Sequence, residues 1–132
     1  MGIIILGGLP ANVVIQGQGS DPPGVGDIST INRTGIVANI ASTKITNAAK
    51  AGVYFVQGCM ECTASGSGTI SFNVTSTDDV GSITQVFGTL PMSIQTQRLN
   101  SSLYLASGDI TFTTTGYVSG TYAIRARWIY GG

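Results

Sequence analysis

The chain contains no histidine, one glutamate and one tryptophan, and only 9% of its 132 residues are charged. An average soluble domain is about a quarter Asp, Glu, Lys and Arg. Acid–base and nucleophilic catalysis lack their usual side chains here, so we do not expect an enzyme. A surface this poor in charge is weakly protected against association. We therefore expect a subunit whose surface is covered by copies of itself or by other proteins.

An excess of charge of either sign is also missing, because six basic residues balance six acidic ones. Arg125 and Arg127 are the densest basic cluster, and two charges are too few to neutralise a nucleic-acid backbone. Long apolar runs are absent as well. The run Ile3–Leu6 is too short to span a membrane and lacks the basic flank of a secretory signal. We expect neither a nucleic-acid nor a membrane partner.

Cysteine is limited to Cys59 and Cys62. A zinc site would need two further ligands, and residues three apart on a strand point to opposite faces. Two ordinary reduced thiols are therefore expected. The pair Asp78–Asp79 could form a carboxylate pair or, with Asp109, a calcium site, but solvated turns are favoured. No metal or cofactor is expected.

Short β-branched runs separated by Gly, Ser, Asn and Asp make up most of the chain, which is typical of an all-β sandwich or barrel. The alternation of apolar and polar residues predicts nine strands. These are Thr34–Ile40, Thr43–Thr46, Gly52–Thr63, Thr69–Thr77, Ser82–Phe87, Met92–Gln95, Ser102–Ala106, Ile110–Thr114 and Thr121–Tyr130.

The last of these strands, Thr121–Tyr130, carries the tryptophan and two tyrosines on one face. This pattern predicts a core anchor in a central strand, since an exposed apolar edge would aggregate. Arg125 and Arg127 lie on the opposite face. They are interpreted either as a solvated face or as ion-pairing residues at a subunit contact, with an acid from the set Glu61, Asp78, Asp79 and Asp109.

The first 26 residues differ from the remainder. Proline and glycine in Gln16–Gly24 prevent regular structure, which predicts an extended arm over residues 1–26 and a folded domain over 27–132. The arm's apolar residues would dock on its own domain or on a neighbouring subunit. The candidates are Ile3, Ile4, Ile5, Leu6, Val13 and Ile15. An ordinary first strand of the same domain is the alternative.

A family resemblance is carried by several segments in order. The run Ala51–Tyr54 opens a long strand, Thr69–Thr75 follows a Ser/Gly turn, and Gly120–Arg127 closes the chain. Two further segments, Ser102–Leu105 and Ala106–Thr114, lie between Thr75 and Gly120. This pattern resembles the small C1q/TNF-like jelly-roll modules of tailed-bacteriophage virion proteins, over roughly Asn32 to Tyr130.

The resemblance implies an antiparallel jelly-roll β-sandwich. It also implies a homotrimer that acts as a structural protein of a phage particle. We expect a capsid decoration (cement) protein that binds the major capsid protein or another virion protein and stabilises the head. Such a protein would be assembled in the host cytoplasm and lie on the capsid surface. The alternative is a tail-fibre, head-fibre or baseplate module that binds a host receptor or glycan.

Overall fold

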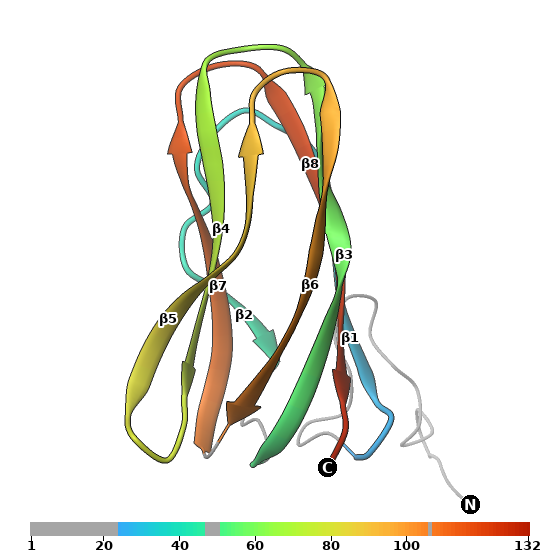
Figure 1. Cartoon of the computed structure of the whole chain (residues 1–132), viewed down its shortest axis with the longest axis vertical. Coiled ribbons are helices and arrows are strands. Elements are labelled where there is room, and N and C mark those ends of the chain that lie inside the picture. The colour runs from blue at the N-terminus through green and yellow to red at the C-terminus, as the bar shows by residue number, and fades with distance from the viewer. Residues whose placement is uncertain (1–23, 47–50, 106) are drawn as a thin grey trace, which may run out of the picture.

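Eight strands and no helix make up the part of the chain that the computed structural model describes, residues 24–46, 51–105 and 107–132. The strands are β1 (Ile28–Ile36), β2 (Thr43–Thr46), β3 (Gly52–Ala64), β4 (Gly68–Thr77), β5 (Ser82–Pro91), β6 (Gln95–Leu105), β7 (Ser107–Tyr117) and β8 (Thr121–Tyr130). They form two four-stranded sheets in the orders β1-β8-β3-β6 and β2-β7-β4-β5. The sheets lie face to face in an elongated sandwich (Figure 1).

The order of the strands identifies the topology. Every pairing is antiparallel, and the chain crosses between the sheets at each connection except that from β4 to β5. A double-sheet arrangement in which β1 pairs with β8 and β2 pairs with β7 is a jelly roll. The expected all-β, antiparallel jelly-roll sandwich is therefore confirmed.

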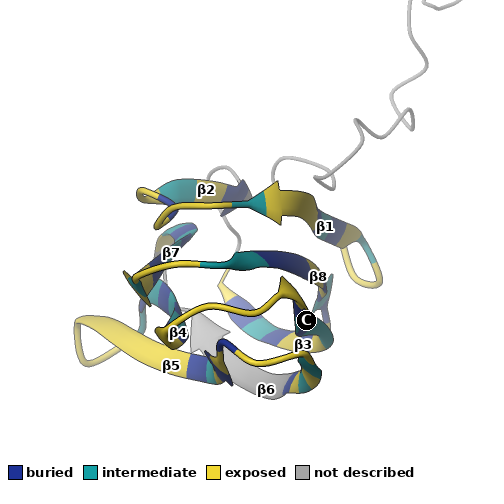
Figure 2. Cartoon of the chain, turned by 90° about the horizontal axis from the view of Figure 1, so that it is seen from above, coloured by how far each residue is buried: buried dark blue, intermediate teal, exposed yellow. Residues whose placement is uncertain are grey.

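The core lies between the two inner faces of the sheets. Buried residues alternate with more exposed ones along several strands in Figure 2. Trp128 occupies its centre, with ring centroids 6.1 Å from Phe72 and 6.5 Å from Phe87. The alternating apolar residues of the predicted strands Thr69–Thr77 and Ile110–Thr114 are buried, namely Ile70, Phe72, Val74, Ile110 and Phe112. Aromatic contacts across the sandwich thus join both sheets.

Strand β8 matches its expected bounds, Thr121–Tyr130, and lies between β1 and β3 as predicted. Its aromatic residues are buried, and Trp128 is 1% exposed. Arg125 and Arg127 are exposed on the other face. In this central position both backbone edges of the apolar strand are paired, so no apolar edge is left open to association with other chains.

The strand expected at Thr34–Ile40 is wrong, because β1 spans Ile28–Ile36 instead. Gly35 has a positive φ of 62°, and the register with β8 shifts between Arg33 and Ile36. Ile40 is buried from a loop, where its backbone N–H donates to Thr114 Oγ1 at 2.7 Å. Because the buried Ile40 is apolar, this segment shows the alternation of apolar and polar residues that is typical of a strand, although it is a loop.

The boundaries around β5 and β6 also differ from the expectation. Strand β5 extends the strand expected at Ser82–Phe87 to Pro91. The strand expected at Met92–Gln95 is wrong, because residues 92–94 form a bend. Strand β6 begins at Gln95, well before the expected start at Ser102. Strand β7 begins at Ser107, before the expected start at Ile110, and extends to Tyr117. These polar segments are strands because neighbouring strands pair with them, and local sequence carries little of that information.

A buried network of polar groups fastens the β1–β2 loop to the sandwich. The Tyr122 hydroxyl donates to the carbonyl of Ala38 at 2.7 Å and lies 2.8 Å from Thr114 Oγ1. The same Thr114 oxygen accepts the Ile40 N–H, so each buried hydroxyl makes two hydrogen bonds. Burial raises the pKa of Tyr122, its hydrogen bond with Thr114 opposes this shift, and nearby Tyr117 adds to it.

The ends of the described chain meet at the opposite end of the sandwich. Gly26 N–H donates to the Tyr130 carbonyl at 2.7 Å, and Val53 N–H donates to the Gly132 carbonyl at 3.2 Å. Of the expected arm over residues 1–26, only Gly24 to Gly26 lie within the described residues. These residues directly precede β1, and Gly26 contacts the end of β8.

Candidate functional site

The outer face of the β1-β8-β3-β6 sheet carries the largest group of charged side chains that the structure describes. Strand register places Arg125 opposite Asn32 on one side and Cys59 on the other, and Cys59 opposite Arg98. The next outward row places Arg127 between Thr30 and Gln57. Opposed residues share a face. We call these seven residues, with Thr96 and Glu61, the arginine face.

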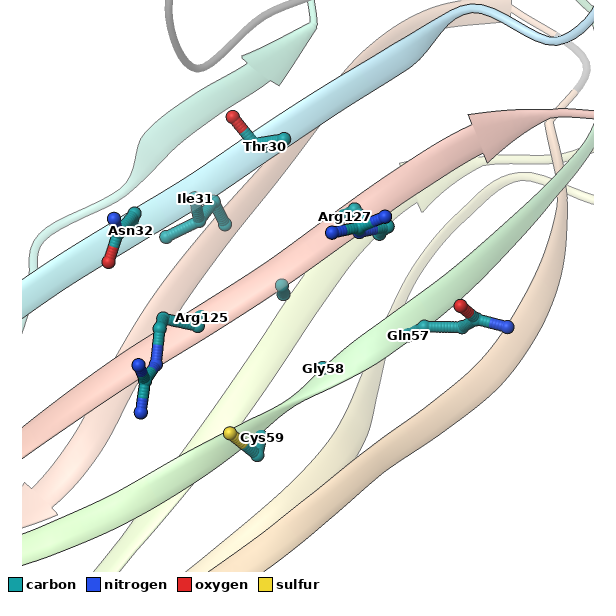
Figure 3. Close-up of a pocket in the computed structure, with 9 residues that line it drawn as sticks. Thr30, Ile31, Asn32, Gln57, Gly58, Cys59, Arg125 and Arg127 are labelled. Atoms are coloured by element: carbon teal, nitrogen blue, oxygen red, sulfur yellow. The ribbon is translucent and has the colours of Figure 1, made fainter.

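The arginine face is hollowed. A depression of about 490 Å³ lies over β1, β8 and β3, with Thr30 and Asn32 of β1 on one side, Gln57 and Cys59 of β3 on the other, and Arg125 and Arg127 on β8 between them (Figure 3). A second depression of about 690 Å³ shares Gln57 and Cys59 and extends to Arg98 on β6. The two adjoining depressions, called the hollow below, together extend over all four strands of the sheet.

Gly58 determines how closely β3 and β8 approach beneath this hollow. A Cβ at Gly58 would collide with the Arg125 carbonyl oxygen and would lie 2.6 Å from the Ala126 Cα atom. A glycine is required here by the close approach of another backbone. The floor of the depression is thus formed by backbone and small side chains.

Charge on the arginine face is only partly balanced. Arg125 Nη2 lies 3.1 Å from Glu61 Oε1, and both side chains are more than a third exposed. Arg98 and Arg127 make no ion pair with any residue that the structure describes. The arginine face therefore carries three guanidinium groups and one carboxylate. The ion pair between Arg125 and Glu61 is exposed and therefore weak.

The placement of the two predicted arginines agrees with the solvated-face interpretation, and the ion pair across a subunit contact stays a prediction. Arg125 and Arg127 face solvent, and the partner of Arg125 is Glu61 of the same chain. Of the other acids considered, Asp109 pairs with Lys44 at 3.3 Å. Asp78 accepts backbone N–H groups of Val80 and Gly81 and so caps the β4–β5 turn. The remaining predicted interface residues, Ile3, Ile4, Ile5, Leu6, Val13 and Ile15, lie outside the described residues.

The two cysteines occupy opposite faces of β3, as their spacing predicted. Cys59 is half-buried on the arginine face, and Cys62 is buried in the core with its thiol 3.3 Å from the Ala64 carbonyl. Both are free. Within the described ranges, no group of three or more His, Cys, Asp or Glu residues could hold a metal ion, and no helix has the length and apolar character to span a membrane.

Sequence reasoning missed Arg98, Gln57 and Asn32 as neighbours of the two arginines. Gln57 faces outward in the alternation of β3, which was a usable local signal. Arg98 lies in a stretch that was not expected to be a strand. Only the pairing of β6 with β3 brings it beside Cys59.

No protein-family model and no curated protein matches the chain. Among solved structures, the chain is similar to the CBM22-1-GH10 modules of the Clostridium thermocellum xylanase 10B, which were crystallised with xylohexaose. The identity is 10%, the TM-score is 0.48, and the match covers 89% of this chain. It covers 24% of the xylanase chain, so the chain spans about a quarter of the length of that protein.

Proposed function

We propose that this chain is a non-catalytic structural protein of a bacteriophage particle, which forms a homotrimer and decorates the capsid surface. The strand pattern that resembles phage jelly-roll modules and the poverty of charge both support this function. Three identical subunits would present three copies of each weak contact to the shell, and such multivalency strengthens attachment. The major capsid protein is the proposed partner.

The observation that carries the proposal is the exposed edge strand β5. It pairs with β4 alone, and Ser82–Pro91 contains no charged residue. Figure 2 shows most of β5 exposed, and Ile83 and Val86 are 42% and 59% exposed. An uncharged edge strand with exposed apolar side chains is a template for association unless another chain covers it. We assign that covering role to a second copy of this chain.

The test is the mass of the full-length protein by light scattering after size exclusion. We expect a trimer for the wild type and a monomer for Val86→Lys, because a charge on β5 would have to be buried without a partner. Val118→Lys is the matched control, since Val118 is 65% exposed in the β7–β8 turn, away from the edge of β5. A monomeric wild type, or a Val86→Lys variant that remains trimeric, contradicts the proposed covering of β5.

Attachment is tested separately on purified phage heads that lack their decoration protein. We expect the wild-type trimer to bind these heads and to raise the temperature at which they release DNA. A trimer that binds no head would refute the proposed role on the capsid but would agree with the proposed homotrimer. That outcome favours the second candidate, a fibre or baseplate module that binds a receptor or glycan, for which the hollow on the arginine face is the specific observation.

A further inference from the structure

The arginine face combines unneutralised positive charge with a polar hollow. Arg125 and Arg98 flank Cys59 in one row, so their Cα atoms lie about 10 Å apart, two strand spacings. Arg127 lies two residues further along β8, about 7 Å from Arg125. Guanidinium groups remain charged at any physiological pH and bind carboxylate and sulfate oxygens through two parallel hydrogen bonds. The face is therefore suited to a ligand with several separate anionic groups.

The neutral residues of the hollow narrow the class of ligand. Thr30 and Asn32 on β1, Gln57 on β3 and Thr96 on β6 present hydroxyl and amide groups around the arginines. These groups donate and accept hydrogen bonds, as the hydroxyl groups of a sugar do. Phe55 is 48% exposed two residues before Gln57 on the same face, where its ring can cover the apolar side of a sugar.

Other anionic partners fit less well. A nucleic acid carries a denser row of phosphates than three arginines and one glutamate can neutralise. A protein interface is usually centred on a buried apolar or aromatic anchor, whereas the middle of this hollow is lined by polar side chains and backbone. The depression is broad, which suits an extended chain rather than one small ion.

We propose that the arginine face binds an acidic polysaccharide, whose chain crosses β1, β8, β3 and β6 and places carboxylate or sulfate groups against Arg127, Arg125 and Arg98. This inference goes beyond a structural role in a particle. It does not depend on the covering of β5, because the arginine face and β5 belong to different sheets.

The experiment measures binding of the full-length protein to three probes by isothermal titration calorimetry: polygalacturonate, dextran sulfate and uncharged dextran. We expect binding to at least one charged probe, weakened by salt, and none to dextran. Preference between the charged probes identifies the anionic group. Equal binding to all three, or no binding to either charged probe, overturns the proposal.

Two charge-removing variants locate the site. Arg127→Gln and Arg98→Gln should each weaken binding roughly tenfold, because each removes a charge-assisted contact. Lys44→Gln is the matched control, since Lys44 is a half-exposed cation on the other sheet; it should retain wild-type affinity. Equal weakening by all three variants would indicate non-specific attraction to net charge and overturn the assignment.

The mass of each variant, measured alongside, distinguishes a ligand site from a subunit contact. We expect Arg98→Gln and Arg127→Gln to keep the mass of the wild type. A wild type that binds no polyanion, together with arginine variants of lower mass, would mean that copies of the chain cover this face, and the ligand site would be refuted.

Discussion

Removing the Tyr122 hydroxyl is the sharpest test of how the loop end of the sandwich is held. The side chain is fully buried, and its hydroxyl makes two hydrogen bonds, with Thr114 Oγ1 and with the Ala38 carbonyl. A typical buried hydrogen bond contributes about 1 kcal/mol. Tyr122→Phe should therefore lower the free energy of unfolding by about 2 kcal/mol, and the midpoint of thermal unfolding by roughly 8 °C.

Tyr130→Phe is the matched control at the other end of β8. The Tyr130 hydroxyl makes one hydrogen bond, to the Ala51 carbonyl at 2.7 Å, so the expected loss is about half as large. Urea unfolding followed by tryptophan fluorescence measures both variants, since Trp128 reports the core directly. A Tyr122→Phe variant as stable as the wild type, or less affected than Tyr130→Phe, would refute the role of this network.

The same side chain predicts a dependence on pH. Burial raises the pKa of Tyr122 above its usual value of about 10, so the folded state holds this proton more tightly than the unfolded chain does. The associated stability is complete below about pH 10 and is lost as the pH rises through the folded-state pKa. The decline in unfolding free energy above pH 10 should be shallower in Tyr122→Phe, and equal slopes would contradict the burial of an ionisable hydroxyl.

Two further predictions concern strand β3. Gly58→Ala should lower the unfolding free energy by about 2 kcal/mol in the same urea assay, because the added methyl group collides with the Arg125 carbonyl; unchanged stability would mean that β3 and β8 separate there at no cost. Alkylation of the native protein with iodoacetamide should modify Cys59 and spare the buried Cys62, as read by peptide mass spectrometry. Equal modification of both thiols would place Cys62 outside the core.

The sequence predicted those strands whose apolar residues alternate over a long stretch. Strand β8 matched its bounds and β3 and β4 nearly so, since one inner face of each is continuous and buried. Ile40 misled the prediction of β1 because a side chain buried from a loop gives the same local pattern as a strand residue. Strand β6 was predicted too short, because its polar beginning is stabilised by pairing with β3, which is distant in sequence.

The candidate site was predictable only residue by residue. The outward direction of Arg125 and Arg127 follows from the alternation of β8, and the structure agrees. Their proximity to Arg98 and Gln57 depends on the register of three strands from separate parts of the chain. A one-residue slip in that register would turn the whole group to the other face, so a single sequence cannot fix it.

The described chain enters and leaves the sandwich at the same end, and this arrangement determines how the domain responds to mechanical load. Strands β1 and β8 are antiparallel neighbours, and Ile28 at the start of β1 lies opposite Ile129 at the end of β8. A force that pulls Gly24 away from Gly132 therefore acts across the strands and opens their hydrogen bonds one after another, as in a zipper. A force between Gly24 and the β7–β8 turn would instead act along β1 and load all of those bonds together. The domain should thus resist tension along its long axis far better than tension between its two ends.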